Sequence, residues 1–201
     1  MQKKTNFASI LFPNELIFDS SVRRFSDIHT HTPSKPLSIL SVPVSEVEQI
    51  VLRNAIGETE QYYSLQLHPW HLKTEEDILQ FTVKVRELRE DPHFIAVGEC
   101  GLDGLAGTPL PLQQKAFRAA LQIADELQKP VIIHCVKLWS ELIAETRGHK
   151  GLMIIHGFRK GPALAQQMLD AGFSLSLGTR YNEEVMKLIP AEKLYRETDE
   201  N

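Results

Sequence analysis

Short apolar runs alternate with amphipathic stretches along most of the chain. The runs are four to six residues long and mostly lack polar alternation, a pattern typical of strands buried in a parallel sheet. We interpret eight such runs as strands, at residues 25–29, 37–42, 62–67, 94–99, 131–134, 152–156, 173–177 and 194–197.

Apolar residues recur at helical spacing between most of the predicted strands. In the segment 74–89, Ile78, Phe81 and Val85 share one helix face, and the opening Thr-Glu-Glu-Asp is a capping signature. Further helices are predicted at 45–55, 112–127, 138–146, 162–171 and 182–188. This alternation of strands and helices predicts a parallel sheet with helices outside it.

Eight strands of this kind predict an α/β protein with a TIM-like (β/α)8 barrel, in which chemistry lies at the C-terminal ends of the strands. An open, doubly wound sheet is the alternative, although the sequence has no glycine-rich phosphate loop of that fold. The sequence stops soon after the eighth predicted strand, so we expect the barrel to lack its last helix. Residues 1–24 are interpreted as an N-terminal extension of unknown role, and residues 25–201 as the barrel.

The composition is that of an ordinary globular protein. With 201 residues, 42% of them hydrophobic and 24% charged, the chain is long enough for one domain with a sizeable core. Its net charge of −4 indicates no basic surface for nucleic acid, so attraction for a phosphate has to come from local charge such as metal ions. No apolar run approaches the roughly 20 residues that cross a bilayer. We therefore expect a cytoplasmic monomer without membrane contact.

The two cysteines, Cys100 and Cys135, exclude a disulfide scaffold and favour a reducing compartment. Each follows a candidate metal ligand by one residue. Strand alternation is expected to turn both thiols away from those ligands and toward the outer helices. The prediction is two buried, reduced thiols.

Candidate metal ligands gather at the ends of the predicted strands, beginning with the first. Asp27, His29 and His31 form an Asp-x-His-x-His series. Because the strand period is two, these three side chains share one side of the strand, and the two imidazoles can reach one cation. The alternative is a pair of surface histidines after a strand.

Two carboxylates occupy comparable positions. Glu99 ends a buried strand, where an unpaired charge is very costly, and its two oxygens allow it to bridge two metal ions. The alternative for Glu99 is a structural salt bridge. Asp199 follows the last strand and is the best candidate for a general base that takes a proton from the attacking water. Taken alone, Asp199 would be an ordinary aspartate near the end of the chain.

His134 and His156 each end an apolar run. One such histidine is usually a satisfied core residue, but two on successive strands favour metal binding. Together with the other candidates they give four imidazoles and two carboxylates, a set that suits zinc, manganese, iron or nickel better than calcium or magnesium, although magnesium stays among the options. We predict two divalent metal ions, which can lower the pKa of a bound water and stabilise the attacking and leaving oxygens.

The motifs, in their order along the chain, resemble those of the TatD deoxyribonuclease family, which belongs to the amidohydrolase-like metal-dependent hydrolases. They are Asp27-x-His29-x-His31, Leu67-His68-Pro69, Gly98-Glu99-Cys100-Gly101-Leu102-Asp103, Pro130-Val131-Ile132-Ile133-His134, His156-Gly157-Phe158 and Glu197-Thr198-Asp199. The resemblance covers residues 25–199, and Gly-Glu-x-Gly-Leu-Asp is its most specific motif.

This resemblance implies a TIM-like barrel and a metal-dependent nuclease that acts on DNA ends. It implies one metal held by His29, His31 and Asp199, a second held by His134 and His156, and Glu99 shared between them. It also implies that His68 lies near the substrate phosphate.

Three residues are candidates for substrate binding, namely His68, Asp103 and Arg159. Each has a plainer alternative, as a loop histidine, a turn aspartate or a solvated charge at the start of a helix. Trp70 can stack on a base or pack against the barrel rim. The family usually has an arginine where Val136 stands and a small residue where Arg159 stands. These departures concern the substrate and leave the six metal ligands in place.

The leading hypothesis is therefore a metal-dependent hydrolase of phosphodiesters, most simply a deoxyribonuclease. A second hypothesis keeps the metals but changes the bond to an amide, a lactone or a phosphotriester. A third, from another class, is a metal-binding protein with little catalysis.

Overall fold

A computed structural model describes residues 22, 25–33 and 37–199 of the chain. Within these residues, eight strands form one sheet in the order of the sequence, and all neighbouring strands are parallel. The strands are β1 (Asp27–Thr30), β2 (Ser38–Pro43), β3 (Tyr62–Leu67), β4 (Phe94–Asp103), β5 (Val131–Val136), β6 (Met153–Ile155), β7 (Ser174–Leu177) and β8 (Leu194–Arg196). The predicted parallel barrel is confirmed.

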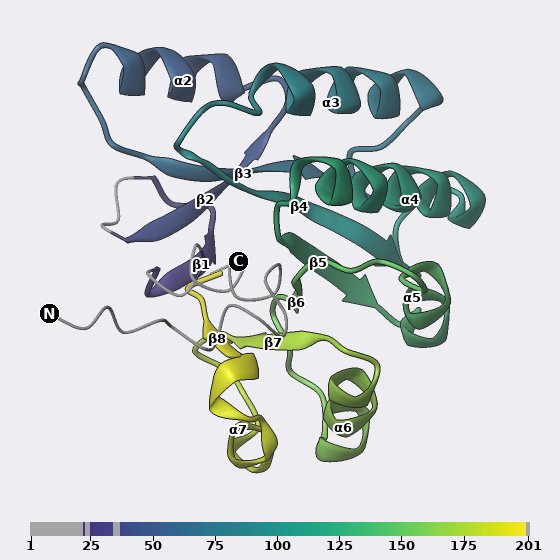
Figure 1. Cartoon of the computed structure of the whole chain (residues 1–201). Coiled ribbons are helices and arrows are strands. Elements are labelled where there is room, and N and C mark those ends of the chain that lie inside the picture. Colours follow the sequence, from purple (N-terminus) through teal and green to yellow (C-terminus); the bar gives the residue numbers. More distant parts are fainter. Residues whose placement is uncertain (1–21, 23–24, 34–36, 200–201) are drawn as a thin grey trace, which may run out of the picture.

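Helices lie outside the ring of strands, along the top, the right and the bottom of the view in Figure 1. They are α2 (Val47–Ala55), α3 (Glu75–Glu87), α4 (Leu110–Leu127), α5 (Trp139–Glu145), α6 (Pro162–Asp170), α7 (Glu183–Leu188) and the short 3-10 helix η2 (Ala191–Lys193). The capping box predicted at the start of α3 is present between Thr74 and Asp77. No helix follows β8 in the part that the structure describes, which ends at Asp199. None of the described helices combines the length and apolar character needed to cross a membrane.

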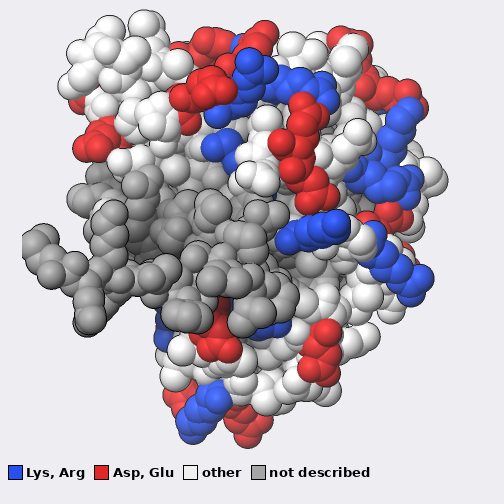
Figure 2. Space-filling model, viewed as in Figure 1, with Lys and Arg blue, Asp and Glu red and all other residues white. Residues whose placement is uncertain are grey.

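Ion pairs join the outer helices to one another. Figure 2 shows acidic and basic side chains mixed over the helical surface, with neither sign dominating the face drawn. Arg86 of α3 lies 2.9 Å from Glu126 of α4, and Arg118 of α4 lies 2.7 Å from Glu145 of α5. These two ion pairs link α3 to α4 and α4 to α5.

Apolar side chains form two layers, one inside the ring of strands and one between the strands and the helices. The inner cluster consists of Val22, Phe25, Ile28, Ile39, Ile95, Ala96, Ile132, Ile154 and Tyr195. Cys100 and Cys135 belong to the outer cluster and are buried free thiols, as predicted. Val22, from the segment interpreted as an extension, packs in the inner cluster, while the rest of residues 1–24 lies outside the described residues.

Among the described residues, β8 and β1 are not paired as strands. Hydrogen bonds to a side chain of β1 connect the two instead. Thr198, just after β8, donates its backbone N–H to Asp27 Oδ1 of β1 at 3.0 Å and its hydroxyl to Asp27 Oδ2. The Asp27 carboxylate also accepts the backbone N–H of His29 at 3.3 Å. Asp27 thus links the first strand to the segment after the last strand, two residues before the candidate metal ligand His29.

Two glycines allow β4 to approach β5 unusually closely. A Cβ at Gly98 would lie 2.2 Å from the Ile132 carbonyl oxygen, and one at Gly101 would lie 2.1 Å from the His134 carbonyl oxygen. Both glycines also have positive φ, +125° and +147°, which L side chains rarely adopt. The pairing register shifts between Gly98 and Cys100, and this irregularity lets Glu99 face the mouth of the barrel.

Candidate metal centre

The six predicted metal ligands meet at the C-terminal ends of the strands. Five of them line a cavity of about 260 Å³, namely His31, Glu99, His134, His156 and Asp199. The sixth, His29, lies fully buried beside this cavity. Strands β1, β5, β6 and β8 each supply a ligand from near their C-terminal end or from the residues just after it, and β4 supplies Glu99 at its irregular stretch. The ligands meet because parallel strands end at the same rim of a barrel.

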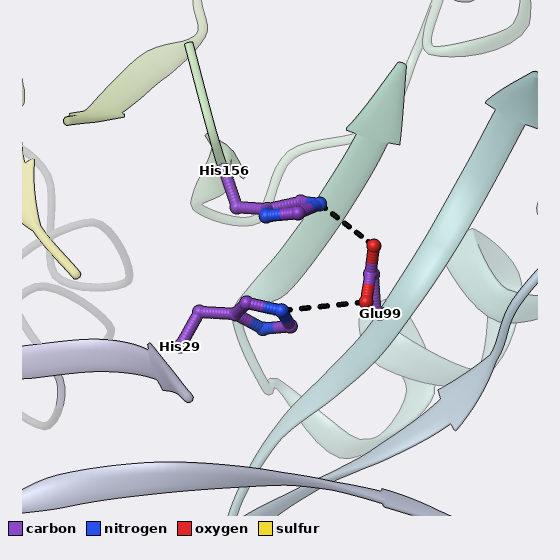
Figure 3. Close-up of side chains that lie close together, drawn as sticks. All are labelled: His29, Glu99 and His156. Atoms are coloured by element: carbon purple, nitrogen blue, oxygen red, sulfur yellow. Dashed lines mark ion pairs between the residues drawn. The ribbon is translucent and has the colours of Figure 1, made fainter. Parts of the chain in front are cut away.

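Glu99 stands between two pairs of histidines. Its Oε2 lies 3.3 Å from His29 Nε2 and 3.8 Å from His31 Nε2. Its Oε1 lies 2.7 Å from His156 Nε2 and 2.9 Å from His134 Nδ1. Figure 3 shows His29 and His156 reaching toward the two oxygens of the same carboxylate. The geometry places one carboxylate oxygen on each side of the cluster.

Asp199 completes the cluster at distances longer than hydrogen bonds. Its Oδ1 lies 4.0 Å from His29 Nε2 and 3.7 Å from His31 Nε2, and its Oδ2 lies 3.7 Å from His156 Nδ1. Several of these atoms are buried without a hydrogen-bond partner in the described part of the chain, namely both ring nitrogens of His29, His156 Nδ1 and Asp199 Oδ1. Buried polar atoms without partners are costly. Divalent cations would satisfy one nitrogen of each ring and Asp199 Oδ1, so the donor set fits divalent metal ions.

The ionisable groups of the cluster shift one another's pKa values. Burial raises the pKa of Glu99, but His156, His134 and His29 outweigh it and hold that pKa well below its usual range. Burial lowers the pKa of His156, but the Glu99 carboxylate outweighs it and raises the pKa to about 9. Burial and the neighbouring His29 lower the pKa of His31. Glu99 is therefore anionic, and a metal ion binding here has to displace a proton from the cluster.

Asp103 contacts a candidate ligand on the side away from Glu99. Its Oδ2 lies 2.9 Å from His134 Nε2 and accepts the indole N–H of Trp70 at 2.7 Å. Nε2 of His134 is directed at Asp103, while Nδ1 of the same ring lies 2.9 Å from Glu99 Oε1. A carboxylate that orients a histidine in this way is common around metal sites. The sequence predicts that Asp103 orients a ligand or contacts the substrate, and in the structure Asp103 contacts the candidate ligand His134.

Gln113 of α4 fixes the backbone of Asp103. Its side-chain oxygen accepts the Asp103 N–H at 2.8 Å, and its amide N–H donates to the Asp103 carbonyl at 3.0 Å. Its amide also donates to the Thr108 carbonyl at 2.7 Å. Gln113 is almost fully buried, and sequence reasoning missed it because its position in an amphipathic helix carries no chemical signal.

Glu197 is a second residue to which sequence reasoning gave no role. It is buried, accepts the Gly157 backbone N–H at 2.6 Å, and lies 3.9 Å from His156 Nδ1. It therefore holds the turn that follows His156. Its spacing of two residues from Asp199, which puts both on one side of a strand, was the available signal.

His68 lies at the edge of the cluster with a defined ring orientation. Its Nδ1 accepts the backbone N–H of Trp70 at 3.1 Å, and its Nε2 lies 3.2 Å from Glu99 Oε1. The neutral ring therefore carries its proton on Nε2, and burial lowers the pKa of His68. Trp70 is 61% exposed at the rim. Arg159 is exposed and is not among the described residues that line the cavity.

Fold and site together define a TIM-like barrel with a buried histidine–carboxylate centre suited to divalent metals. The sequence profile of the TatD-related DNase family matches residues 27–200, and the chain belongs to this family.

Individual relatives agree with this assignment. The chain is 33% identical over 145 residues to a protein from Erwinia billingiae named 3'-5' ssDNA/RNA exonuclease TatD, covering 66% of this chain and 55% of that protein. It is 26% identical to the uncharacterized metal-dependent hydrolase YjjV of Escherichia coli, covering 88% of this chain and 79% of that protein. The chain thus spans about half the length of the exonuclease relatives that it matches.

Solved structures share the fold. The crystal structure of YjjV, a TatD homologue from Escherichia coli, superposes with a TM-score of 0.72 at 21% identity, over 89% of this chain and 80% of that one. A TatD-family hydrolase from Entamoeba histolytica gives a TM-score of 0.66 at 21% identity, over 90% of this chain and 64% of that one. At these identities the likeness concerns the barrel alone.

Proposed function

We propose that the protein is a metal-dependent hydrolase that cleaves phosphodiester bonds in DNA. In the proposed centre, His29, His31 and Asp199 would hold one divalent ion, His134 and His156 would hold a second, and Glu99 would contribute to both. The observation that carries this proposal is the position of Glu99, with one oxygen 3.3 Å from His29 and the other 2.7 Å from His156. Four imidazoles with two carboxylates favour zinc, manganese, iron or nickel over magnesium.

The ions, when bound, supply Lewis acidity that lowers the pKa of a water molecule and stabilises charge on phosphoryl oxygens. Asp199, a carboxylate that lines the cavity, takes the proton from the attacking water. His68 donates its Nε2 proton to a phosphoryl oxygen, since its Nδ1 is already occupied by the Trp70 N–H. Asp103 and Glu197 keep His134 and His156 in place.

The test is cleavage of a labelled single-stranded oligonucleotide, with added metal and with chelator. We expect metal-dependent cleavage by the wild type, no detectable cleavage by Glu99→Gln, and a loss of about 10²-fold or more for Asp199→Asn. Glu126→Gln is the matched control, because Glu126 is an exposed carboxylate that pairs with Arg86 on the outer helices. Cleavage by Glu99→Gln at the wild-type rate would contradict the proposal.

One observation favours testing a second substrate class. No lysine or arginine is among the described residues that line the cavity, and Val136 stands where the family has an arginine. A phosphodiester would thus depend on metal ions for charge complementarity. Amide, lactone and phosphotriester substrates belong in the same assay, and faster turnover of one of them than of DNA would assign the site to that bond. Metal binding without any turnover would indicate a metal-binding protein. The cytoplasmic location and the monomeric state stay predictions.

A further inference from the structure

A second cavity adjoins the metal centre. Its volume is about 240 Å³, and it lies between the ends of β2 and β3 and the first turns of α3. The two cavities share three lining residues, Gln66, His68 and His71. They are therefore neighbouring parts of one cleft. The residues between them lie near the end of β3 (Gln66) and in the loop after it (His68 and His71).

The second cavity is poorly suited to a phosphate. No lysine or arginine is among the described residues of its lining, and the lining contains Asp77. Asp77 Oδ2 accepts the backbone N–H groups of Lys73 and Thr74, both at 2.8 Å, and these bonds lower the pKa of Asp77. The carboxylate is thus ionised at neutral pH and repels a second negative charge. The cavity favours an uncharged part of the substrate.

The remaining lining combines apolar surface with uncharged hydrogen-bonding groups. The apolar part consists of Pro43, Val44, Leu67 and Leu72. The polar part includes the side chains of Ser45, Gln66 and Gln80. Gln66 is buried, and the only hydrogen bond of its side chain within the described residues is a long one of 3.4 Å, from Nε2 to Ser41 Oγ. A heterocyclic base has the matching chemistry, since it offers apolar faces and an edge of donors and acceptors.

The size and position of the cavity limit what it can hold. Pockets for drug-sized ligands have volumes of about 300–1,000 Å³, so this one suits a smaller group such as a single nucleoside. His68 lies at the boundary, with Nε2 3.2 Å from Glu99 Oε1. A group in the second cavity would therefore lie next to a phosphate bound at the candidate metal centre.

We propose that the second cavity binds the nucleoside next to the scissile phosphate, with Gln66 and Gln80 hydrogen-bonding to the base. This inference rests on the proposed phosphodiesterase function and adds a subsite to it. In this proposal, residues at the ends of β2 and β3 and in α3 recognise the uncharged part of the substrate, and the metal ligands take no part in that recognition.

Two chromogenic diesters with the same leaving group test the subsite. In both methyl p-nitrophenyl phosphate and thymidine 5'-(p-nitrophenyl phosphate), water attacks phosphorus and p-nitrophenolate leaves, and only the second ester carries a nucleoside. We expect kcat/KM of the wild-type chain to be about tenfold or more higher for the thymidine ester. Hydrolysis of the methyl ester reports the proposed function, and the ratio of the two esters reports the subsite.

Substitutions that fill the cavity should remove the preference. In Ser45→Trp, and independently in Gln80→Trp, we expect the ratio to fall toward one. Gln122→Trp is the matched control, because Gln122 is exposed on α4 and lines neither cavity, and it should keep the wild-type ratio. Melting temperatures of all three variants show whether they are folded. A wild-type ratio near one, or folded cavity variants that keep the wild-type ratio, would overturn the subsite.

Binding of thymidine provides a readout that does not need catalysis. Saturation-transfer NMR should detect thymidine bound to the wild type and to Gln122→Trp, and a much weaker signal with Ser45→Trp. If the wild type hydrolyses neither ester, the proposed function fails while this measurement still decides the cavity. Absence of thymidine binding to the wild type would contradict the subsite whatever the enzyme assay shows.

Discussion

Trp70 lies at the candidate metal centre and offers both an indole N–H donor and an exposed aromatic ring. Its indole N–H is fixed to Asp103, which in turn contacts His134, while the ring is 61% exposed at the rim. Trp70→Phe keeps an aromatic ring and removes the N–H donor. We expect metal affinity to fall about 10- to 100-fold, as is usual for groups that orient a ligand, and titration calorimetry measures it.

The other tryptophan supplies the control for this prediction. Trp139 packs against Phe158 with ring centroids 6.0 Å apart and is not among the described residues around the cavity. Trp139→Phe should leave the metal affinity unchanged. Equal affinities for the wild type and Trp70→Phe would show that the Trp70–Asp103 hydrogen bond does not position His134.

For single residues, the sequence indicated the candidate metal ligands but not the residues that keep these ligands in position. His29, Glu99 and His156 could be predicted because each stands at the end of an apolar run in the sequence, and the C-terminal ends of barrel strands converge. Gln113 could not, because nothing in a helical sequence pattern tells which polar residue is turned inward. Asp103 was singled out, but only the fold shows that it faces His134 rather than the cavity.

Among the elements, the close contact of β4 with β5 is the feature most sensitive to substitution. In Gly101→Ala, the new Cβ would lie 2.1 Å from the His134 carbonyl oxygen, so the strands must separate. We expect unfolding free energy to fall by at least about 2 kcal/mol, measured by urea denaturation without metal. Gly107→Ala has nothing within 4 Å of the new Cβ and should change stability by less than about 0.5 kcal/mol. Similar stabilities of the two variants would contradict this account.

Closure of the barrel between β8 and β1 gives a second prediction. Thr198→Val removes a hydroxyl that donates to the buried Asp27 carboxylate. We expect a loss of about 1.5–3 kcal/mol, because a charged acceptor loses a donor. Urea denaturation in chelator separates this effect from metal binding at Asp199. Thr179→Val, at an exposed loop position, is the control, and an equally small effect of both substitutions would show that this hydrogen bond does not close the barrel.

The elements themselves were largely predictable, with one instructive exception. The strand predicted at 62–67 is β3 as observed. The strand predicted at 94–99 continues to Asp103 as β4, because Gly98 and Gly101 allow it to stay beside β5 through an irregular stretch. Apolar pattern alone cannot show this, since glycine-rich sequence usually marks the end of a strand.

For the molecule as a whole, stability should depend on pH through a histidine far from the metal centre. Burial lowers the pKa of His149, which lies 3.1 Å from Asp125, so the folded state binds its proton less readily than the unfolded chain does. The stabilisation is complete above the unfolded pKa of about 6.5 and is lost as the pH falls toward the lower folded value. In His149→Gln this loss should be absent.

The comparison uses unfolding free energies at pH 7.5 and pH 5.5 in chelator. The wild type should lose more stability than His149→Gln over this interval, and the difference isolates His149 from the histidines of the metal centre. Parallel pH profiles of the two proteins would contradict a lowered pKa at His149.

Anomalous diffraction from crystals grown with manganese or zinc tests most directly how many metal ions the protein binds and where they lie. We expect two anomalous peaks, one on each side of the Glu99 carboxylate. The first should lie next to His29, His31 and Asp199, and the second next to His134 and His156. A single peak, or peaks that do not contact Glu99, would contradict the proposed two-metal centre.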